Sequence, residues 1–420
     1  MFTKLISMSE PFSFKYHRFQ VPLDWNDPQN TNIISIVLRE VVDNDSTDKP
    51  PLLYFQGGPG FGVRLPTDEK WINELKKRYR IFLLDQRGTG LSTPIDISGI
   101  AEMDKQNRQE TIKFLSNFRA DSIARDAEHI RLKLFSEDKF TTFGQSFGGW
   151  CTFSYLSLFP NSASTCFLTG GFPPVGHGPL DVYRNLLPQV DETNKQFFDK
   201  YPDTKKQLKE LMNTLDSKSL FSLARCGFST GYSPAHGEFR GLIESLYYET
   251  ETLGRITSHS IKKMEDPLSF SSNPIYALLH EPIYCEGIAP AWSGETVMIN
   301  ENKRPSLDDC YKFFLAENIF RKTFDQSPEL QPIRGLMDAL MEFDGWGQLY
   351  NVNNLKDCES TVIGVVYESD AAVVASYSLE SANLLGNGHV IESSLDHSAY
   401  RSDSEEIFGK IFDKNDEVVN

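Results

Sequence analysis

The sequence predicts an α/β fold, a mostly parallel sheet with helices on both faces, that is interrupted by a long helical insertion. Short apolar runs alternate with helical patterns from about residue 50 to 170. Residues 178–352 contain helical patterns without clear strands, and the strand pattern then resumes. We therefore expect a first core part over residues 1–177, a helical cap over 178–352 and a second core part over 353–420.

The N-terminal part is predicted to form strands. Residues 12–21 and 33–42 carry β-branched and aromatic residues in near alternation, and the turn-rich segment DWNDPQN separates them, which indicates a hairpin. The runs PLLYF (51–55) and YRIFLLD (79–85) are too short for helices and precede glycine-rich turns. Such runs are typical of buried parallel strands.

The alternation continues with a helix and two further strands. Residues 121–135 place Ile123, Ala127, Ile130 and Leu134 on one face, as expected of an amphipathic helix. FTTF and TCFLTG then read as strands, and the helical segment between them ends at a proline. After the insertion, the pattern predicts the strand STVIGVVY, the helix SYSLESANLL, the strand HVIESS and the closing helix SEEIFGKIF.

Five aromatic-rich segments of the insertion show a helical pattern. They are YRNLLPQVDETNKQFFDKY, TKKQLKELMNTL, RGLIESLYYETETL, NPIYALLHEPIYC and QPIRGLMDALMEF. Because no clear strand interrupts them, we expect a helical lid over the core.

Composition excludes several classes of protein. The 420 residues include 42 Lys+Arg and 58 Asp+Glu, a formal charge of −16, so the chain should repel nucleic acid and anionic lipid surfaces. No apolar run approaches the length of a membrane span, and the N-terminus lacks the apolar stretch of a signal peptide. We therefore expect a cytoplasmic protein.

The six cysteines are predicted to be reduced, scattered thiols. They form no CxxC pair, and no histidine is spaced to complete a zinc site. We expect neither a metal nor an organic cofactor.

The strongest chemical signal is the pentapeptide Gly144-Gln145-Ser146-Phe147-Gly148, which matches G-x-S-x-G. It lies between a predicted strand and a predicted helix, the context required of a nucleophile elbow. Such a sharp turn needs residues without side chains on either side of the serine, here two positions away at Gly144 and Gly148, and the helix N-terminus behind it favours developing negative charge. Ser146 is therefore the candidate nucleophile.

A serine nucleophile needs a histidine base, and in folds with this elbow the acid and then the histidine follow in the sequence. Only His389 and His397 follow the resumed strand pattern. His389 begins a strand, whereas His397 lies in the polar loop after that strand, at the edge where active sites of parallel sheets gather. We predict His397 as the base.

The acid is expected in the loop after the strand VIGVVY. Asp370 is favoured because two residues beyond the strand end leave room for the loop to turn its carboxylate toward His397. Glu368 is the alternative, and Asp396 should point elsewhere because it is adjacent to His397.

Two backbone N–H groups are needed to bind the oxyanion. One is expected from Phe147, directly after the nucleophile. The other should come from Gly57 or Gly58 in the glycine-rich turn after PLLYF, where bare backbone can approach a ligand closely.

Four segments, in this order and spacing, resemble the longer proline iminopeptidases (prolyl aminopeptidases) of the α/β-hydrolase superfamily. They are QGGPGF (56–61), LLDQRGTGLSTP (83–94), DSIARDAE (121–128) and GQSFGGW (144–150). The cap segment NPIYALLHEPIYCEG and the tail DHSAY also match, so the resemblance spans nearly the whole chain. It implies an α/β-hydrolase fold with an inserted helical cap, and a serine peptidase that releases N-terminal proline from peptides.

The resemblance also implies site residues. Ser146, Asp370 and His397 would form the triad, and glutamates of the cap would recognise the free amino group of the peptide. Glu281 matches one of these glutamates. Glu317 in FLAENIF aligns with the second, although Arg321-Lys322 stands where the family has Pro-Trp, and Glu295 is its rival.

Two aromatic residues of the cap, Tyr284 and Trp292, are candidates for the slot that holds the proline ring. The alternative is that both belong to the core of the cap. Asp85, Arg87 and Gly88 of the second shared segment are expected to act as scaffold rather than in catalysis.

Three other functions fit the same residues. The chain would be an esterase or amidase if the lid serves another substrate, or a broader aminopeptidase if alanine and glycine are accepted. A hydrolase fold that only binds a partner is the third, and it is the least favoured, because it would have a broken triad whereas all three triad residue types are present here. The oligomeric state stays open, with a homo-oligomer among the alternatives.

Overall fold

The computed structural model describes residues 5–6, 12–27, 29, 31–42, 48–64, 70–136 and 138–419. Within these residues nine strands form one sheet. They are β1 (Leu5–Ile6), β2 (Ser13–Pro22), β3 (Ile33–Val42), β4 (Pro51–Phe55), β5 (Arg80–Asp85), β6 (Phe140–Gln145), β7 (Ala163–Thr169), β8 (Thr361–Tyr367) and β9 (Gly388–Ser393). Most of the N-terminal segment before residue 12, and parts of the first turn, lie outside the described residues.

The strand order is β1-β2-β3-β5-β4-β6-β7-β8-β9. Strands β2 and β3 form the expected antiparallel hairpin, and β3 pairs antiparallel with β5. From β5 to β9 every pair is parallel. The predicted mostly parallel α/β fold is therefore confirmed.

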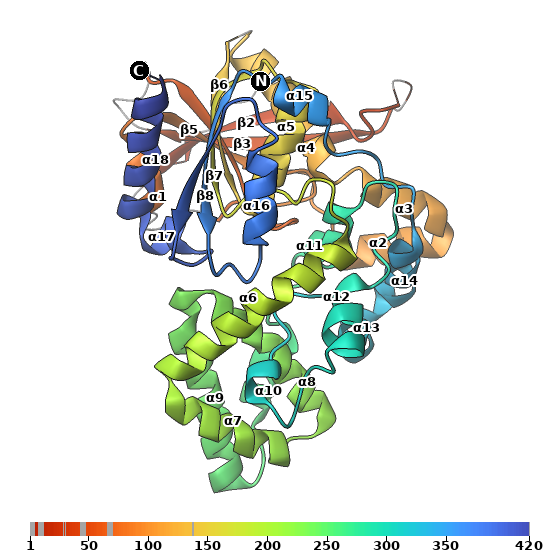
Figure 1. Cartoon of the computed structure of the whole chain (residues 1–420). Helices are drawn as coiled ribbons and strands as arrows, with labels where there is room; N and C mark the ends of the chain where they lie inside the picture. The colour runs from red at the N-terminus through yellow and green to blue at the C-terminus, as the bar shows by residue number, and fades with distance from the viewer. Residues whose placement is uncertain are drawn as a thin grey trace.

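Helices cover both faces of this sheet (Figure 1). The core helices are α1 (Lys70–Lys76), α2 (Ile97–Gln106), α3 (Arg108–Ser116), α4 (Ala120–Leu134), α5 (Phe147–Leu158), α15 (Val352–Lys356), α16 (Ala375–Ala382), α17 (Ala399–Ser402) and α18 (Ser404–Val419). Because side chains alternate along a strand, Leu53 and Phe55 of β4 pack in one cluster with α4 and α5. Leu52 and Tyr54 pack in the opposite cluster with α1 and α18.

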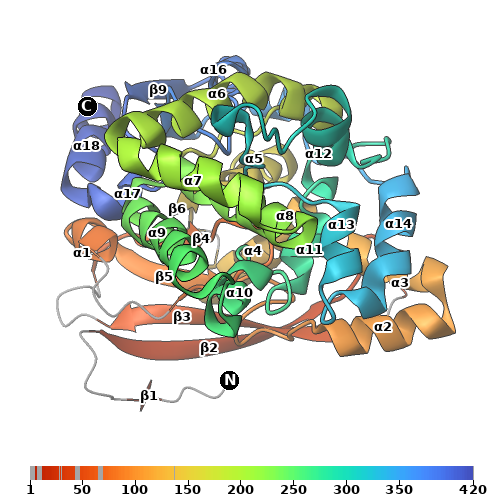
Figure 2. The ribbon, with the colours of Figure 1, turned by 90° about the horizontal axis from the view of Figure 1, so that it is seen from below.

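The segment between β7 and β8 contains helices and, in this fully described stretch, no strand. We call residues 178–352 the cap. Its α-helices are α6 (Pro179–Lys200), α7 (Pro202–Thr214), α8 (Ser217–Cys226), α9 (His236–Leu253), α10 (Ser258–Glu265), α11 (Pro274–Leu279), α12 (Ser293–Glu295), α13 (Arg321–Gln326) and α14 (Arg334–Glu342). Between them lie the short 3-10 helices η1 (Gly227–Gly231), η2 (Ser233–Ala235), η3 (Pro282–Tyr284), η5 (Cys310–Lys312) and η6 (Gln331–Ile333), and the π-helix η4 (Thr296–Glu301). Seen from below, α6 to α9 lie in front of the core (Figure 2).

Helices α8 and α10 were not among the expected segments. Both begin at a side-chain cap: the Asp216 carboxylate accepts hydrogen bonds from the backbone N–H of Lys218 and Ser219, and Thr257 accepts one from Ser260. Caps of this kind satisfy amides that the first helical turn leaves unpaired. Each helix has ten residues or fewer, so its apolar pattern alone was too short to identify it.

Asp85 and Arg87 are buried in polar networks, in agreement with a scaffolding role. Asp85 pairs with Arg39 and accepts hydrogen bonds from the backbone N–H of Val63 and Leu91. Arg87 forms a bidentate pair with Asp126. These bonds fix the loops that follow β4 and β5, next to the end of β6.

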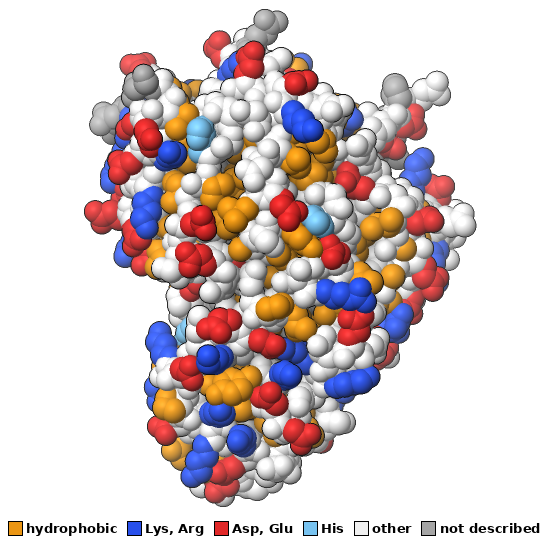
Figure 3. All heavy atoms as spheres, viewed as in Figure 1, with side chains coloured by type: hydrophobic (Ala, Val, Ile, Leu, Met, Phe, Trp, Pro, Cys, Tyr) orange, Lys and Arg blue, Asp and Glu red, His pale blue; other side chains and the backbone are white. Residues whose placement is uncertain are grey.

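Acidic and basic side chains are interspersed over both the core and the cap on the face seen in Figure 3. Of the helices that the structure describes, none has the length and apolar character to cross a bilayer.

Candidate active site

Ser146 lies at a sharp turn between β6 and α5. Its φ is 53° and its ψ is −125°, a backbone conformation that non-glycine residues rarely adopt. A Cβ on Gly144 would lie 2.5 Å from the Gly148 carbonyl oxygen, and a Cβ on Gly148 would lie 2.0 Å from that of Phe55. Steric crowding by backbone therefore explains both glycines of the pentapeptide.

His397 and Asp370 are paired in the loops that follow β9 and β8. The imidazole Nδ1 lies 2.7 Å from Asp370 Oδ2, and both residues are buried. The other oxygen, Oδ1, accepts hydrogen bonds from the backbone N–H of Ala372 and Val373, at 2.8 and 3.0 Å. A carboxylate fixed in this way holds the Nδ1 proton and leaves Nε2 with its lone pair.

The surroundings of His397 change its pKa in two directions. Burial lowers the pKa because it disfavours the imidazolium, and the negative charge of Asp370 raises it. The net direction is upward from the ordinary value of a histidine.

The other candidates for the base and acid lie elsewhere. His389 Nε2 pairs with Asn387 Oδ1 within the start of β9. Glu368 is exposed, and the Asp396 carboxylate accepts hydrogen bonds from the backbone N–H of Ser233 and Ser398. Of the carboxylates that the sequence left open, only Asp370 forms a hydrogen bond to His397 in the described part of the chain.

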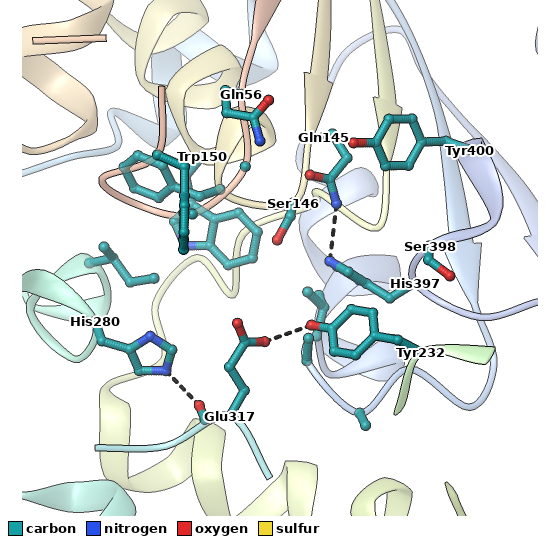
Figure 4. A pocket seen from close by; sticks show the side chains of 18 of the residues that line it. Gln56, Gln145, Ser146, Trp150, Tyr232, His280, Glu317, His397, Ser398 and Tyr400 are labelled. Atoms are coloured by element: carbon teal, nitrogen blue, oxygen red, sulfur yellow. Dashed lines mark hydrogen bonds between the residues drawn. The ribbon is translucent and has the colours of Figure 1, made fainter. Parts of the chain in front are cut away.

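Ser146 and His397 border a cavity of about 270 Å³ between the strand ends of the core and the cap (Figure 4). Gly57, Gly58 and Phe147, the expected oxyanion residues, also line it. Gly58 has a φ of 143°, which glycine adopts without strain. The structure thus brings the predicted core residues to one cavity.

Glu317 closes the cavity from the cap side, in the segment between η5 and α13. Its carboxylate accepts a hydrogen bond from the Tyr232 hydroxyl, at 2.6 Å. Burial raises the pKa of Glu317, and the bond from Tyr232 acts in the opposite direction. In Figure 4 the carboxylate lies between the side chains of Ser146 and His280.

His280 supports the segment that carries Glu317. Burial lowers the pKa of His280 to about 4, so the ring is neutral at physiological pH. Its Nε2–H donates to the backbone carbonyl oxygen of Glu317, at 2.7 Å.

Glu281 and Glu295 occupy different environments from Glu317. Glu281 is fully buried outside the residues that line the cavity, and its oxygens accept hydrogen bonds from the backbone N–H of Ser293 and Gly294, each at 2.9 Å. Burial raises its pKa to about 8. Glu295 accepts a hydrogen bond from the Arg321 backbone and pairs with its guanidinium. Contrary to the expectation for Glu281, only Glu317 of these three borders the described cavity.

Tyr284 and Trp292 also differ from each other. Tyr284 lines the cavity, with its ring edge-on to Trp150 and Tyr183 at centroid distances of 6.3 and 5.9 Å. The expectation that Trp292 lines the slot does not hold. Its ring is buried against Phe324, with centroids 6.2 Å apart, and is not among the residues that line the cavity.

Sequence reasoning did not assign several residues of the cavity wall, among them Gln145, Trp150, Tyr183 and Tyr232. Gln145 and Trp150 belong to the shared segment GQSFGGW, so the motif itself was a signal for them. Tyr183 and Tyr232 are distant aromatics with no local motif, and only tertiary packing places them here.

No three His, Cys, Asp or Glu side chains of the described residues gather in a way that would hold a metal ion. All six cysteines are free and buried.

The comparisons with known proteins agree with this architecture. The model of the alpha/beta hydrolase fold family matches residues 50–221. A proline iminopeptidase of Aeromonas sobria is 35% identical over 95% of this chain and 96% of its own length. A proline iminopeptidase of Aspergillus aculeatus is 29% identical over 94% of this chain and 92% of its own.

Among solved structures, Rv0554 from Mycobacterium tuberculosis has a TM-score of 0.46 and 14% identity, with 96% of this chain and 99% of that chain covered. An esterase from Rhodococcus sp. ECU1013 has a TM-score of 0.42 and 14% identity, with 92% and 96% covered. The family assignment rests on the 35% identity to the Aeromonas sobria protein over nearly the full length of both chains, together with the match to the alpha/beta hydrolase fold family. The chain belongs to the proline iminopeptidase family of the α/β-hydrolase superfamily.

Proposed function

We propose that the chain is a serine aminopeptidase that releases N-terminal proline from peptides. The observation that carries this proposal is the half-buried carboxylate of Glu317, which, among the carboxylates of the described residues, is the one that borders the same cavity as Ser146 and His397. The names of the relatives support the same activity.

Ser146, His397 and Asp370 would perform a two-step acyl transfer. His397 Nε2 takes the Ser146 proton, and the serine oxygen attacks the prolyl carbonyl carbon. The oxyanion is stabilised by the backbone N–H groups of Phe147 and of Gly57 or Gly58. His397 then protonates the departing amine, and water repeats the sequence to release proline.

Glu317 would bind the secondary ammonium group of the N-terminal proline. The Tyr232 hydroxyl engages one carboxylate oxygen and leaves the other for the substrate. A substrate cation in the cavity lowers the pKa of a nearby carboxyl, so Glu317 is ionised in the complex although burial raises its pKa in the free protein. A blocked N-terminus lacks this ion pair and leaves a buried carboxylate without its partner.

The apolar wall suits a proline ring. Tyr284, Trp150 and Tyr183 form an aromatic cluster on the cavity side of the cap and core. We assign Tyr284 to the slot for the ring, whereas Trp292 and Glu281 belong to the packing of the cap.

We also propose that residues 178–352 act as the lid over the site and that the Glu317 carboxylate on this lid selects substrates with a free N-terminus. The free, buried thiols fit a reducing compartment, and we assign the activity to the cytoplasm.

A panel of aminoacyl arylamides tests the proposal. Proline β-naphthylamide should be hydrolysed, and its N-acetyl derivative should lose at least about 100-fold in kcat/KM, because the loss of a buried ion pair costs several kcal/mol. Equal turnover of the blocked substrate, or preference for p-nitrophenyl esters, would instead indicate an esterase or amidase. Comparable turnover of alanine and glycine arylamides would indicate a broader aminopeptidase.

A further inference from the structure

Gln145 is the last residue of β6 and directly precedes Ser146. Its side chain is buried and lines the same cavity. The amide nitrogen Nε2 lies 3.2 Å from His397 Nε2, as the dashed line in Figure 4 shows. No step of the proposed reaction uses this amide.

The protonation of His397 defines the direction of this contact. Asp370 accepts the proton on Nδ1, so Nε2 carries a lone pair and accepts from the Gln145 amide. In the part of the chain that the structure describes, no hydrogen bond joins the Ser146 hydroxyl to His397. The lone pair that must take the serine proton is therefore engaged by the amide of the preceding residue.

Gly57 provides the space for this amide. A Cβ on Gly57 would lie 2.2 Å from Gln145 Oε1. The amide group is thus held between the glycine-rich loop and the imidazole of His397, and a side chain at position 57 would displace it.

We propose that Gln145 is a positioning residue that lowers the basicity of His397 in the free enzyme by donating a hydrogen bond to Nε2. A donor at this lone pair stabilises the neutral imidazole relative to the imidazolium, which has no lone pair there. When the Ser146 hydroxyl bonds to Nε2, it must replace the amide. The inference rests on the proposed function only through the pairing of Ser146 with His397.

The remaining groups around His397 are distinct from Gln145. The negative charges that act on it belong to Asp370 at Nδ1, to Glu317 of the cap and to Asp396. The rings of Tyr232 and Tyr367 pack edge-on against the imidazole. None of these groups donates to Nε2, so a change at residue 145 alters that bond and leaves the surrounding charges in place.

The test is the pH dependence of Ser146 labelling by a fluorophosphonate, which needs a neutral His397 but no prolyl group. In Gln145→Met, which keeps the length of the side chain without the donor, the midpoint of the acid limb should rise by about 0.5–1 pH unit, the equivalent of one ordinary hydrogen bond. In Gln145→Glu a carboxylate faces Nε2 and favours the imidazolium, so the midpoint should rise by about 1–3 units.

Gln56→Met is the matched control. Gln56 lines the same cavity, but its side chain bonds to Tyr54, so the midpoint should stay at the wild-type value. A thermal unfolding transition verifies that each variant is folded. One folded Gln145 variant, Gln145→Met or Gln145→Glu, is sufficient to test the inference. An unchanged or lowered midpoint in a folded Gln145 variant overturns the inference. Absence of labelling in the wild type would instead count against Ser146 as the nucleophile.

Discussion

The core and the cap each contribute one half of the cavity, and the two halves are held in different ways. In the core, Ser146 and the glycines around it are fixed by backbone crowding: the Cβ of a residue at position 148 would lie 2.0 Å from a carbonyl oxygen. In the cap, Glu317 is held by side chains from distant segments, Tyr232 at its carboxylate and His280 at its carbonyl.

This difference separates chemistry from selection. In the proposed reaction the core half supplies the nucleophile, the base and the oxyanion donors, which any ester or amide substrate requires. In the same proposal the cap half supplies the Glu317 carboxylate, which matters only to a substrate with a free ammonium group. Changes in the core should therefore affect all substrates, whereas changes at Glu317 should affect only those with a free N-terminus.

Replacement of the nucleophile gives the largest expected effect. Ser146→Ala should lower kcat by about 10⁴-fold or more on both proline arylamide and a p-nitrophenyl ester, since the hydroxyl has no substitute. Steady-state kinetics on the two substrates measure this. A variant that keeps more than about 1% of the wild-type rate on either substrate would contradict the assignment of Ser146.

Glu317→Gln should affect the two substrates differently. Loss of the charge should lower kcat/KM for proline β-naphthylamide by about 10²–10³-fold, the range expected when one partner of a buried ion pair is removed. The ester has no ammonium group, so its kcat/KM should stay within a few fold of the wild type.

Glu295→Gln is the matched control because Glu295 is a cap glutamate that pairs with Arg321 outside the cavity wall. Both substrates should be hydrolysed at wild-type rates. An equal loss on ester and arylamide in Glu317→Gln would show that Glu317 serves the chemistry rather than the selection.

The core half could be predicted from the sequence because its constraints are local. The pattern Gly144-x-Ser146-x-Gly148 encodes a turn at which neighbouring backbone leaves no room for a Cβ on either glycine. The apolar patterns of the predicted strands showed where those strands end, and thereby identified the loops that carry Asp370 and His397. The same strand periods predicted the parallel sheet. Short capped helices such as α8 could not be predicted from the sequence, because a cap residue alone is a weak signal.

The cap half could be predicted only in part. The match of its segment to the family favours Glu281, yet the backbone amides of Ser293 and Gly294 bind its carboxyl group inside the cap. Proximity in sequence favours Trp292 at the slot, although its ring packs against Phe324 and does not line the cavity. Neither residue carries a local pattern that reports the direction of its side chain.

Glu281→Gln should therefore change stability more than catalysis. With a pKa of about 8 the Glu281 carboxyl is largely protonated at pH 7, but both of its oxygens keep lone pairs that accept from the Ser293 and Gly294 amides. The NH2 group of a glutamine only donates, so one buried N–H loses its partner. We expect a loss of about 1–3 kcal/mol in the free energy of unfolding, as for an unsatisfied buried donor. Chemical denaturation at pH 7 measures this change.

Kinetics on the folded Glu281→Gln variant provide the second readout. KM and kcat for proline β-naphthylamide should stay within about threefold, a change of less than one ordinary hydrogen bond. A selective rise in KM for free prolyl substrates, without loss of stability, would return Glu281 to the recognition of the amino group.

The smallest expected effect concerns His177, which joins the two halves. Its Nδ1 lies 2.8 Å from Asp181 of α6 in the cap, and its Nε2 lies 2.9 Å from Glu380 of α16 in the core. Its ring also stacks on Tyr377, with centroids 3.7 Å apart. Burial lowers the pKa of His177, but the two carboxylates outweigh this effect and the net direction is upward.

The raised pKa means that the folded protein binds the proton of His177 more tightly than the unfolded chain does. The stabilisation is therefore complete below the unfolded pKa of about 6.5, and it is lost as pH rises through the higher folded pKa. His177→Phe keeps the stacked ring and removes both polar bonds. Since the site is partly exposed, wild type should exceed this variant by only about 0.5–1 kcal/mol at pH 5.5, and the gap should close by pH 8.5. Thermal unfolding of both proteins across this pH range measures the difference in their free energies of unfolding.

A difference that stays constant with pH would assign the role of His177 to packing alone, and the core and cap would then be joined without a titrating contact at this point.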